Sequence, residues 1–149
     1  MTLQREHEDA AHLATLHVRQ ERDSRYKAHA ISLGGIMTRN DLQAVLDGTG
    51  AECELNGFYV ASGEQHVDNH TTVDHARPSG TSRETYKGVL DGRARGVFAG
   101  RVIVRPDAQK TSAQQTNKNI LLSRDAAIDS KPQLEILADD VKCSHASAV

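Results

Sequence analysis

The sequence contains no tryptophan, and its aromatic residues are only two phenylalanines and three tyrosines among 149 residues. The core must therefore be built from Val, Ile, Leu and Ala, which favours thin, repetitive layers over a globule packed around large rings. Two cysteines, Cys53 and Cys143, are too few for a framework of disulfides. The formal net charge of −2 gives no electrostatic reason to expect a nucleic acid or an acidic membrane surface as a partner.

Long apolar runs are also absent. No segment approaches the roughly 20 apolar residues that cross a bilayer, and no apolar segment follows Met1. We therefore expect a soluble cytoplasmic protein with reduced thiols. Phosphate-binding loops and nucleophile elbows are missing as well, so the chain does not look like an ATPase, a dehydrogenase or a hydrolase.

Turn signals divide most of the chain into short segments of roughly 8–12 residues, a spacing typical of an all-β protein. The signals are Gly34-Gly35, Asp47-Gly48, Asn56-Gly57, Ser62-Gly63, Asp91-Gly92 and Pro106-Asp107. Helical periodicity is weak, and residues 6–20 are the best helical candidate. A meander, a sandwich and a β-solenoid all fit this spacing.

Three features favour the solenoid. The triplet Leu-Asp-Gly recurs at 46–48 and 90–92, with the related Leu-Asn-Gly at 55–57. Small and β-branched residues dominate the expected inward faces, as stacked rungs require. The polar segment 109–119 could form stacked amide ladders along a solenoid corner, or it could be a flexible loop. No linker-like segment divides the chain, so we expect one domain over residues 1–149.

The tripeptide Cys143-Ser144-His145 lies close to the end of the sequence. In a strand, residues i and i+2 share a face, so the thiol and the imidazole should point the same way. Both groups are ligands for iron and zinc, but a structural metal usually needs four ligands. The pair is either half of a metal site completed by another subunit, or a small buried cysteine beside a hydrogen-bonded histidine.

A second candidate is the segment 66–75, where alternation places His66, Asp68, His70 and Asp74 on one strand face. Such a face could chelate a metal, or it could simply be polar and solvated. Cys53 lies between two glutamates that should raise its thiol pKa, so it is a poor nucleophile.

A loose basic region provides no aromatic platform for stacking bases, so we expect it to be a solvated face balanced by Glu135, Asp139 and Asp140. Its members are Arg93, Arg95, Arg101, Arg105 and Lys110.

Several ordered blocks resemble one family. They are RNDL (39–42), GAECELNG (50–57), QHVDNHTTVDH (65–75), YKGVLDGRARGVFAGRVIV (86–104), RPDAQKTSAQQTNKNILLS (105–123) and KPQLEILADDVKCSH (131–145). Together they look like the SufB/SufD family of iron–sulfur cluster assembly proteins, and more closely like SufD, from about residue 12 to the end.

The resemblance implies a right-handed parallel β-helix core and a non-catalytic scaffold role beside a SufB-like subunit and the ATPase SufC. It implies that His145, with Cys143 beside it, contributes to a site for a transient iron–sulfur cluster or iron at the subunit interface. Family members are also associated with a reduced flavin on the complex. No cofactor is expected to stay bound to this chain alone, and a plant member would lie in the plastid stroma.

Two departures from the family pattern matter. The family usually continues CSHGAT, whereas Ala146 here replaces the glycine, so a backbone turn with positive φ would be strained. The family's terminal helical domains are not in the sequence, so we expect an isolated core fragment with impaired recruitment of SufC. Two other functions remain open, a self-associating structural module that pairs through strand edges and a polysaccharide-active β-helix enzyme.

Overall fold

The computed structural model describes residues 1–149 and consists of eleven β-strands without a helix. The strands are β1 (Thr2–Gln4), β2 (Ala11–Gln20), β3 (Arg25–Ser32), β4 (Met37–Leu46), β5 (Glu52–Ala61), β6 (His66–His75), β7 (Thr81–Leu90), β8 (Arg95–Val104), β9 (Ser112–Leu121), β10 (Ala127–Ile136) and β11 (Lys142–Ala148). No helix is present that could cross a membrane.

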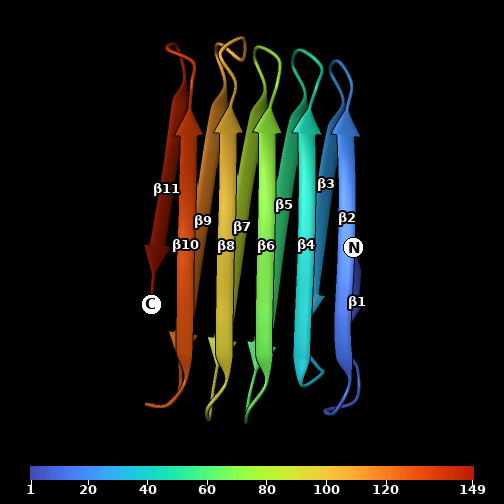
Figure 1. The fold of residues 1–149 in the computed structure, drawn as a ribbon, viewed down its shortest axis with the longest axis vertical. Helices are drawn as coiled ribbons and strands as arrows, with labels where there is room; N and C mark the ends of the chain where they lie inside the picture. The colour runs from blue at the N-terminus through green and yellow to red at the C-terminus, as the bar shows by residue number, and fades with distance from the viewer.

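The strands form two parallel sheets that face each other (Figure 1). The odd-numbered strands make a six-stranded sheet in the order β1-β3-β5-β7-β9-β11, and the even-numbered strands make a five-stranded sheet in the order β10-β8-β6-β4-β2. In Figure 1 the chain runs upward in the near, even-numbered sheet and downward in the far, odd-numbered sheet. It advances from right to left with each turn, so the coil is right-handed. The expected all-β parallel solenoid is confirmed.

Strict alternation along each strand separates the core from the two outer faces. In β8, Phe98, Val102 and Val104 point inward and are almost fully buried, whereas Arg95 and Arg101 point outward. At the turns, backbone hydrogen bonds connect successive rungs. For example, the Asp91 N–H donates to the Ala61 carbonyl. Only the first and last rungs leave strand edges without a partner.

Three segment interpretations need correction. The helical candidate 6–20 is wrong, because β2 occupies most of it with alternating exposed and half-buried residues. The pair Asn56-Gly57 is not a turn, since β5 runs straight through it. The polar segment 109–119 is neither a corner nor a loop, because most of it lies in β9 and turns Gln115, Asn117 and Asn119 into the core.

Two glycines in the interior make room for tyrosine rings on the neighbouring rung. Gly57 lies beside Tyr86, and Gly88 lies beside Tyr59, in reciprocal parallel pairs. A Cβ atom at Gly57 would come within 2.2 Å of the Tyr86 ring, and one at Gly88 within 2.3 Å of the Tyr59 ring. The few large rings of this sequence therefore fit because glycine occupies the adjacent position.

We expect Gly88→Ala to destabilise the protein by about 1–3 kcal/mol, because the added methyl overlaps a ring that is buried and cannot move aside. The midpoint of urea unfolding measures the effect. Thr81→Ala, on the exposed face of the same strand, is the control, since it places no added atom in the interior. Equal stability of Gly88→Ala and the wild type would contradict this packing.

Candidate functional site

The Cys-Ser-His segment lies in β11, the last strand of the solenoid. Cys143 pairs with Ala113 of β9, and His145 pairs with Gln115, and both of these partners face the core. The thiol and the imidazole are therefore on the same inward face, as alternation predicts. Within residues 1–149, Cys143 is half-buried and His145 is exposed.

Local geometry supports an ordered pair at this open end. Partial burial raises the pKa of the Cys143 thiol, and a hydrogen bond with the Ala113 backbone offsets part of the rise. The two sheets are joined at the same end by a hydrogen bond of 2.9 Å from Ser147 Oγ to Ser130 Oγ. The expected strain at Ala146 is wrong, because this residue lies within β11 and is not among the residues with positive φ.

A buried polar network lies directly beneath His145, and the sequence reasoning missed it. Gln115 Nε2 donates a hydrogen bond of 2.7 Å to Glu84 Oε2, and Glu84 is only 2% exposed. Glu84, Gln115 and His145 occupy equivalent positions on three successive rungs. The alternation of inward and outward residues could have predicted that Glu84 is buried, since it shares its strand face with Tyr86 and Leu90.

Burial raises the pKa of Glu84, and the hydrogen bond from Gln115 offsets only part of that rise. The folded state therefore holds a proton that the unfolded state releases near the ordinary glutamate pKa of 4.5. Stability should fall as pH rises through the interval between these two pKa values, because the unfolded state binds fewer protons there.

Glu84→Gln should remove this loss, so its stability relative to the wild type should increase as the pH rises above the ordinary glutamate pKa of 4.5. The gain should be about 1.4 kcal/mol for each unit by which the two pKa values differ. Unfolding free energies measured from acidic to mildly alkaline pH provide the test. A stability difference that does not change with pH would contradict a raised pKa for Glu84.

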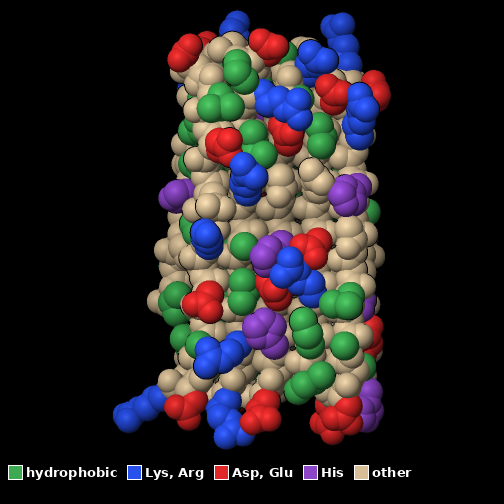
Figure 2. All heavy atoms as spheres, in the orientation of Figure 1, with side chains coloured by type: hydrophobic (Ala, Val, Ile, Leu, Met, Phe, Trp, Pro, Cys, Tyr) green, Lys and Arg blue, Asp and Glu red, His purple; other side chains and the backbone are tan.

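The His/Asp face of β6 is present as predicted, but its groups are engaged with each other and with arginines. His70 Nε2 lies 2.8 Å from Asp68 Oδ1, Arg39 pairs with Asp68, and Arg105 Nη2 lies 2.6 Å from Asp74. No group of three or more His, Cys, Asp or Glu side chains could hold a metal ion. The face is ion-paired rather than freely solvated, because Asp68 and Asp74 are buried beneath their arginine partners. Figure 2 shows basic, acidic and histidine side chains mixed on this side of the molecule.

Cys53 and the basic region also have ordinary structural roles. Burial, followed by the nearby Glu84, raises the pKa of the Cys53 thiol to about 12, so the direction expected from its acidic neighbours is correct although the cause differs. In the basic region, Arg93 pairs with Glu64, and Arg101 pairs with Glu135. Arg105 pairs with Asp74, so of the three expected acidic partners only Glu135 forms an ion pair with this region.

The fold and the site define a class of protein, a parallel β-solenoid that places a thiol and an imidazole on one face of β11. The SUF-system FeS cluster assembly model for the SufBD core domain matches residues 1–149. The chain therefore belongs to the SufBD family.

Named relatives agree with this membership. An iron–sulfur cluster assembly SufBD family protein of Synechocystis is 37% identical over 98% of this chain and 32% of the relative. The chloroplastic protein ABCI7 of Arabidopsis thaliana is 36% identical over 99% of the chain and 31% of its own length. SufD of Escherichia coli is 36% identical over 82% of the chain and 29% of its own length. The chain thus spans about a third of the length of these relatives.

Proposed function

We propose that residues 1–149 form a single β-solenoid core domain of a SufD-type scaffold subunit in iron–sulfur cluster assembly. Family membership and the relative named SufD support the assignment. The observation that carries it is the placement of Cys143 and His145 together on the inward face of β11.

This placement suits a site shared between two subunits. Two side chains are too few to enclose a metal, whereas they can add ligands to those of another protein. A SufB-like subunit is the proposed partner, with iron and sulfide as the cargo, and His145 as the main ligand from this chain.

The scaffold itself is proposed to be non-catalytic, with ATP hydrolysis supplied by a SufC-like subunit that binds outside this core. The protein would work in the cytoplasm, or in the plastid stroma of a plant, as the chloroplastic relative suggests.

The hollow over the six-stranded sheet does not suit a flavin ring. A flavin ring is usually held in an apolar or aromatic slot. Here Tyr59, Tyr86 and Phe98 are buried inside the solenoid, and the hollow over the six-stranded sheet is lined mostly by charged and polar side chains. We therefore assign no flavin role to these residues.

Co-purification of the full-length protein with a SufB-like subunit, followed by size-exclusion mass measurement, tests the assignment. A stable one-to-one complex is expected. Concentration-dependent self-association without binding of SufB would contradict the proposal and favour a self-associating module. The polysaccharide-active alternative has little support, since the outward Asp68 and Asp74 are each engaged by an arginine.

A further inference from the structure

The outer face of the six-stranded sheet is strongly basic, although the whole chain carries a net charge of −2. Its basic side chains are Arg25, Lys27, Arg83, Lys87, Lys118 and Lys142. The only acidic side chains on the strands of this face, Glu52 and Glu54, are paired with Arg25 and Lys27. The other four cations form no ion pair with any acidic side chain.

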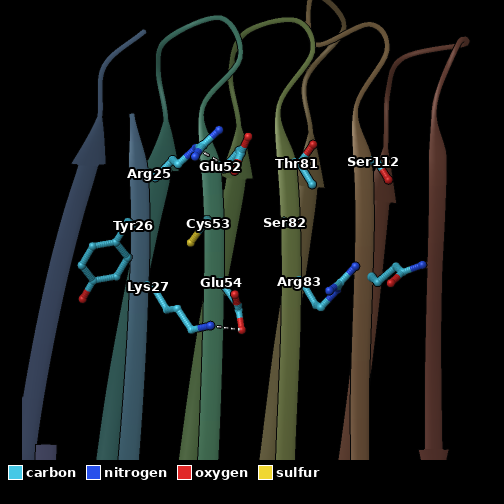
Figure 3. Close-up of a pocket in the computed structure, with 11 residues that line it drawn as sticks. Arg25, Tyr26, Lys27, Glu52, Cys53, Glu54, Thr81, Ser82, Arg83 and Ser112 are labelled. Atoms are coloured by element: carbon cyan, nitrogen blue, oxygen red, sulfur yellow. Dashed lines mark ion pairs between the residues drawn. The ribbon is translucent and has the colours of Figure 1, made fainter. Parts of the chain in front are cut away.

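Figure 3 shows this arrangement around a hollow of about 370 Å³. Arg25 and Lys27 lie against Glu52 and Glu54, while Arg83 extends from β7 without an acidic partner. Thr81 and Ser112 add hydroxyl groups beside it. An exposed cation that no carboxylate satisfies is available to an anionic group of another molecule.

An apolar row crosses the same face beside the lysines. Val60, Val89 and Ile120 are neighbours across three strands, and Ile120 is 59% exposed. The adjacent row contains Lys87 and Lys118 together with Phe58, which is 41% exposed. Apolar and basic groups therefore run in parallel across β5, β7 and β9, on a surface that nothing in this chain covers.

The spacing of these rows matches an α-helix lying across the strands. Neighbouring strands are about 4.8 Å apart, and one helical turn advances about 5.4 Å, so each turn can place one side chain over each strand. Apolar residues at positions i, i+3 and i+7 of this helix would then contact Val60, Val89 and Ile120. Lys87 and Lys118 lie two residues before Val89 and Ile120 on the same strands. Acidic residues on one flank of the helix would therefore lie over these two lysines.

We propose that this face, the β5–β7–β9 face, is a docking surface for an amphipathic α-helix of a partner protein with glutamate or aspartate on one flank. Charge complementarity identifies the acidic flank, and the apolar row identifies the helix face. A nucleic acid fits less well, because the face has no aromatic platform beyond Phe58 on which bases could stack. The surface is on the outer side of the six-stranded sheet, whereas Cys143 and His145 lie on the inner face of the neighbouring strand β11.

Fluorescence anisotropy with the full-length protein tests this proposal with two labelled helical peptides. Both carry leucine at i, i+3 and i+7, and they differ only in having glutamate or lysine on the flank. We expect the glutamate peptide to bind, with affinity that falls as salt increases, and the lysine peptide not to bind. The variant Lys87→Gln/Lys118→Gln should weaken binding about fivefold, since exposed ion pairs contribute roughly 0.5 kcal/mol each.

The variant Val60→Thr/Ile120→Thr should weaken binding by a similar factor while it preserves strand propensity. The control is Arg95→Gln/Lys131→Gln on the opposite sheet, which should leave affinity unchanged. The proposal is overturned if neither peptide binds, as expected when another segment of the same polypeptide covers the face, or if the control weakens binding equally. The proposal is also overturned if a DNA duplex or phosphatidylserine vesicles bind more tightly than the glutamate peptide and the lysine variant abolishes that binding.

Discussion

Replacing His145 with alanine in the full-length subunit should lower the iron and sulfide content of the assembled complex by about tenfold or more. Loss of an outer-shell partner alone commonly costs 10–100-fold in metal affinity, and a direct ligand should cost at least as much. His145 is exposed at the end of β11 and contributes nothing to the core, so the variant should keep its fold. Anaerobic iron and sulfide quantitation measures the loss.

Two companion variants make this result specific. His29→Ala removes an exposed histidine from the outer face of β3 and should leave cluster content unchanged. His145→Cys retains a metal ligand at the same position and should recover part of the loss. Unchanged iron and sulfide in His145→Ala would show that the residue assignment is wrong, even with the family membership intact.

Phe98→Ala should be among the most destabilising single substitutions in this chain, at about 3–5 kcal/mol. Phe98 is fully buried between the two sheets, and its ring centroid lies 5.0 Å from that of Tyr86. With so few aromatic side chains in the core, neighbouring Val, Ala and Gly residues cannot fill the resulting cavity. The shift in the midpoint of chemical unfolding gives the magnitude.

The chain contains a matched control for this substitution. Phe58 lies in a strand of the opposite sheet but points outward and is 41% exposed. Phe58→Ala should therefore cost no more than about 1 kcal/mol. Similar costs for the two substitutions would mean that the inward and outward faces of β5 or β8 are assigned incorrectly.

Turn spacing predicted an all-β chain, and the recurring Leu-Asp-Gly triplets with small inward residues favoured the solenoid over a meander or a sandwich. Alternation along the strands placed Cys143 beside His145 and grouped the His/Asp face of β6 correctly. Turn spacing failed where two local signals compete. Asn56-Gly57 reads as a hairpin turn, but Gly57 is required inside β5 because Tyr86 occupies the adjacent space.

The features that were missed depend on which residues become neighbours across rungs. Lys87 and Lys118 are 31 positions apart in the sequence, yet the register places them side by side. Glu84 and Gln115 meet in the same way inside the core. Which residues become neighbours depends on the length of each rung, and that length varies with the turns. The sequence alone therefore did not reveal that Lys87 and Lys118 lie side by side.

Direct detection of the histidine ligand is the decisive measurement. Full-length subunit labelled only with ¹⁵N-histidine would be assembled with an unlabelled SufB-like partner, and the reduced cluster would be examined by pulsed EPR. A ¹⁵N hyperfine coupling that disappears in His145→Ala is the expected result. Absence of any ¹⁵N coupling on a fully loaded cluster, or a coupling that persists in His145→Ala, would contradict a site completed by the last rung of this solenoid.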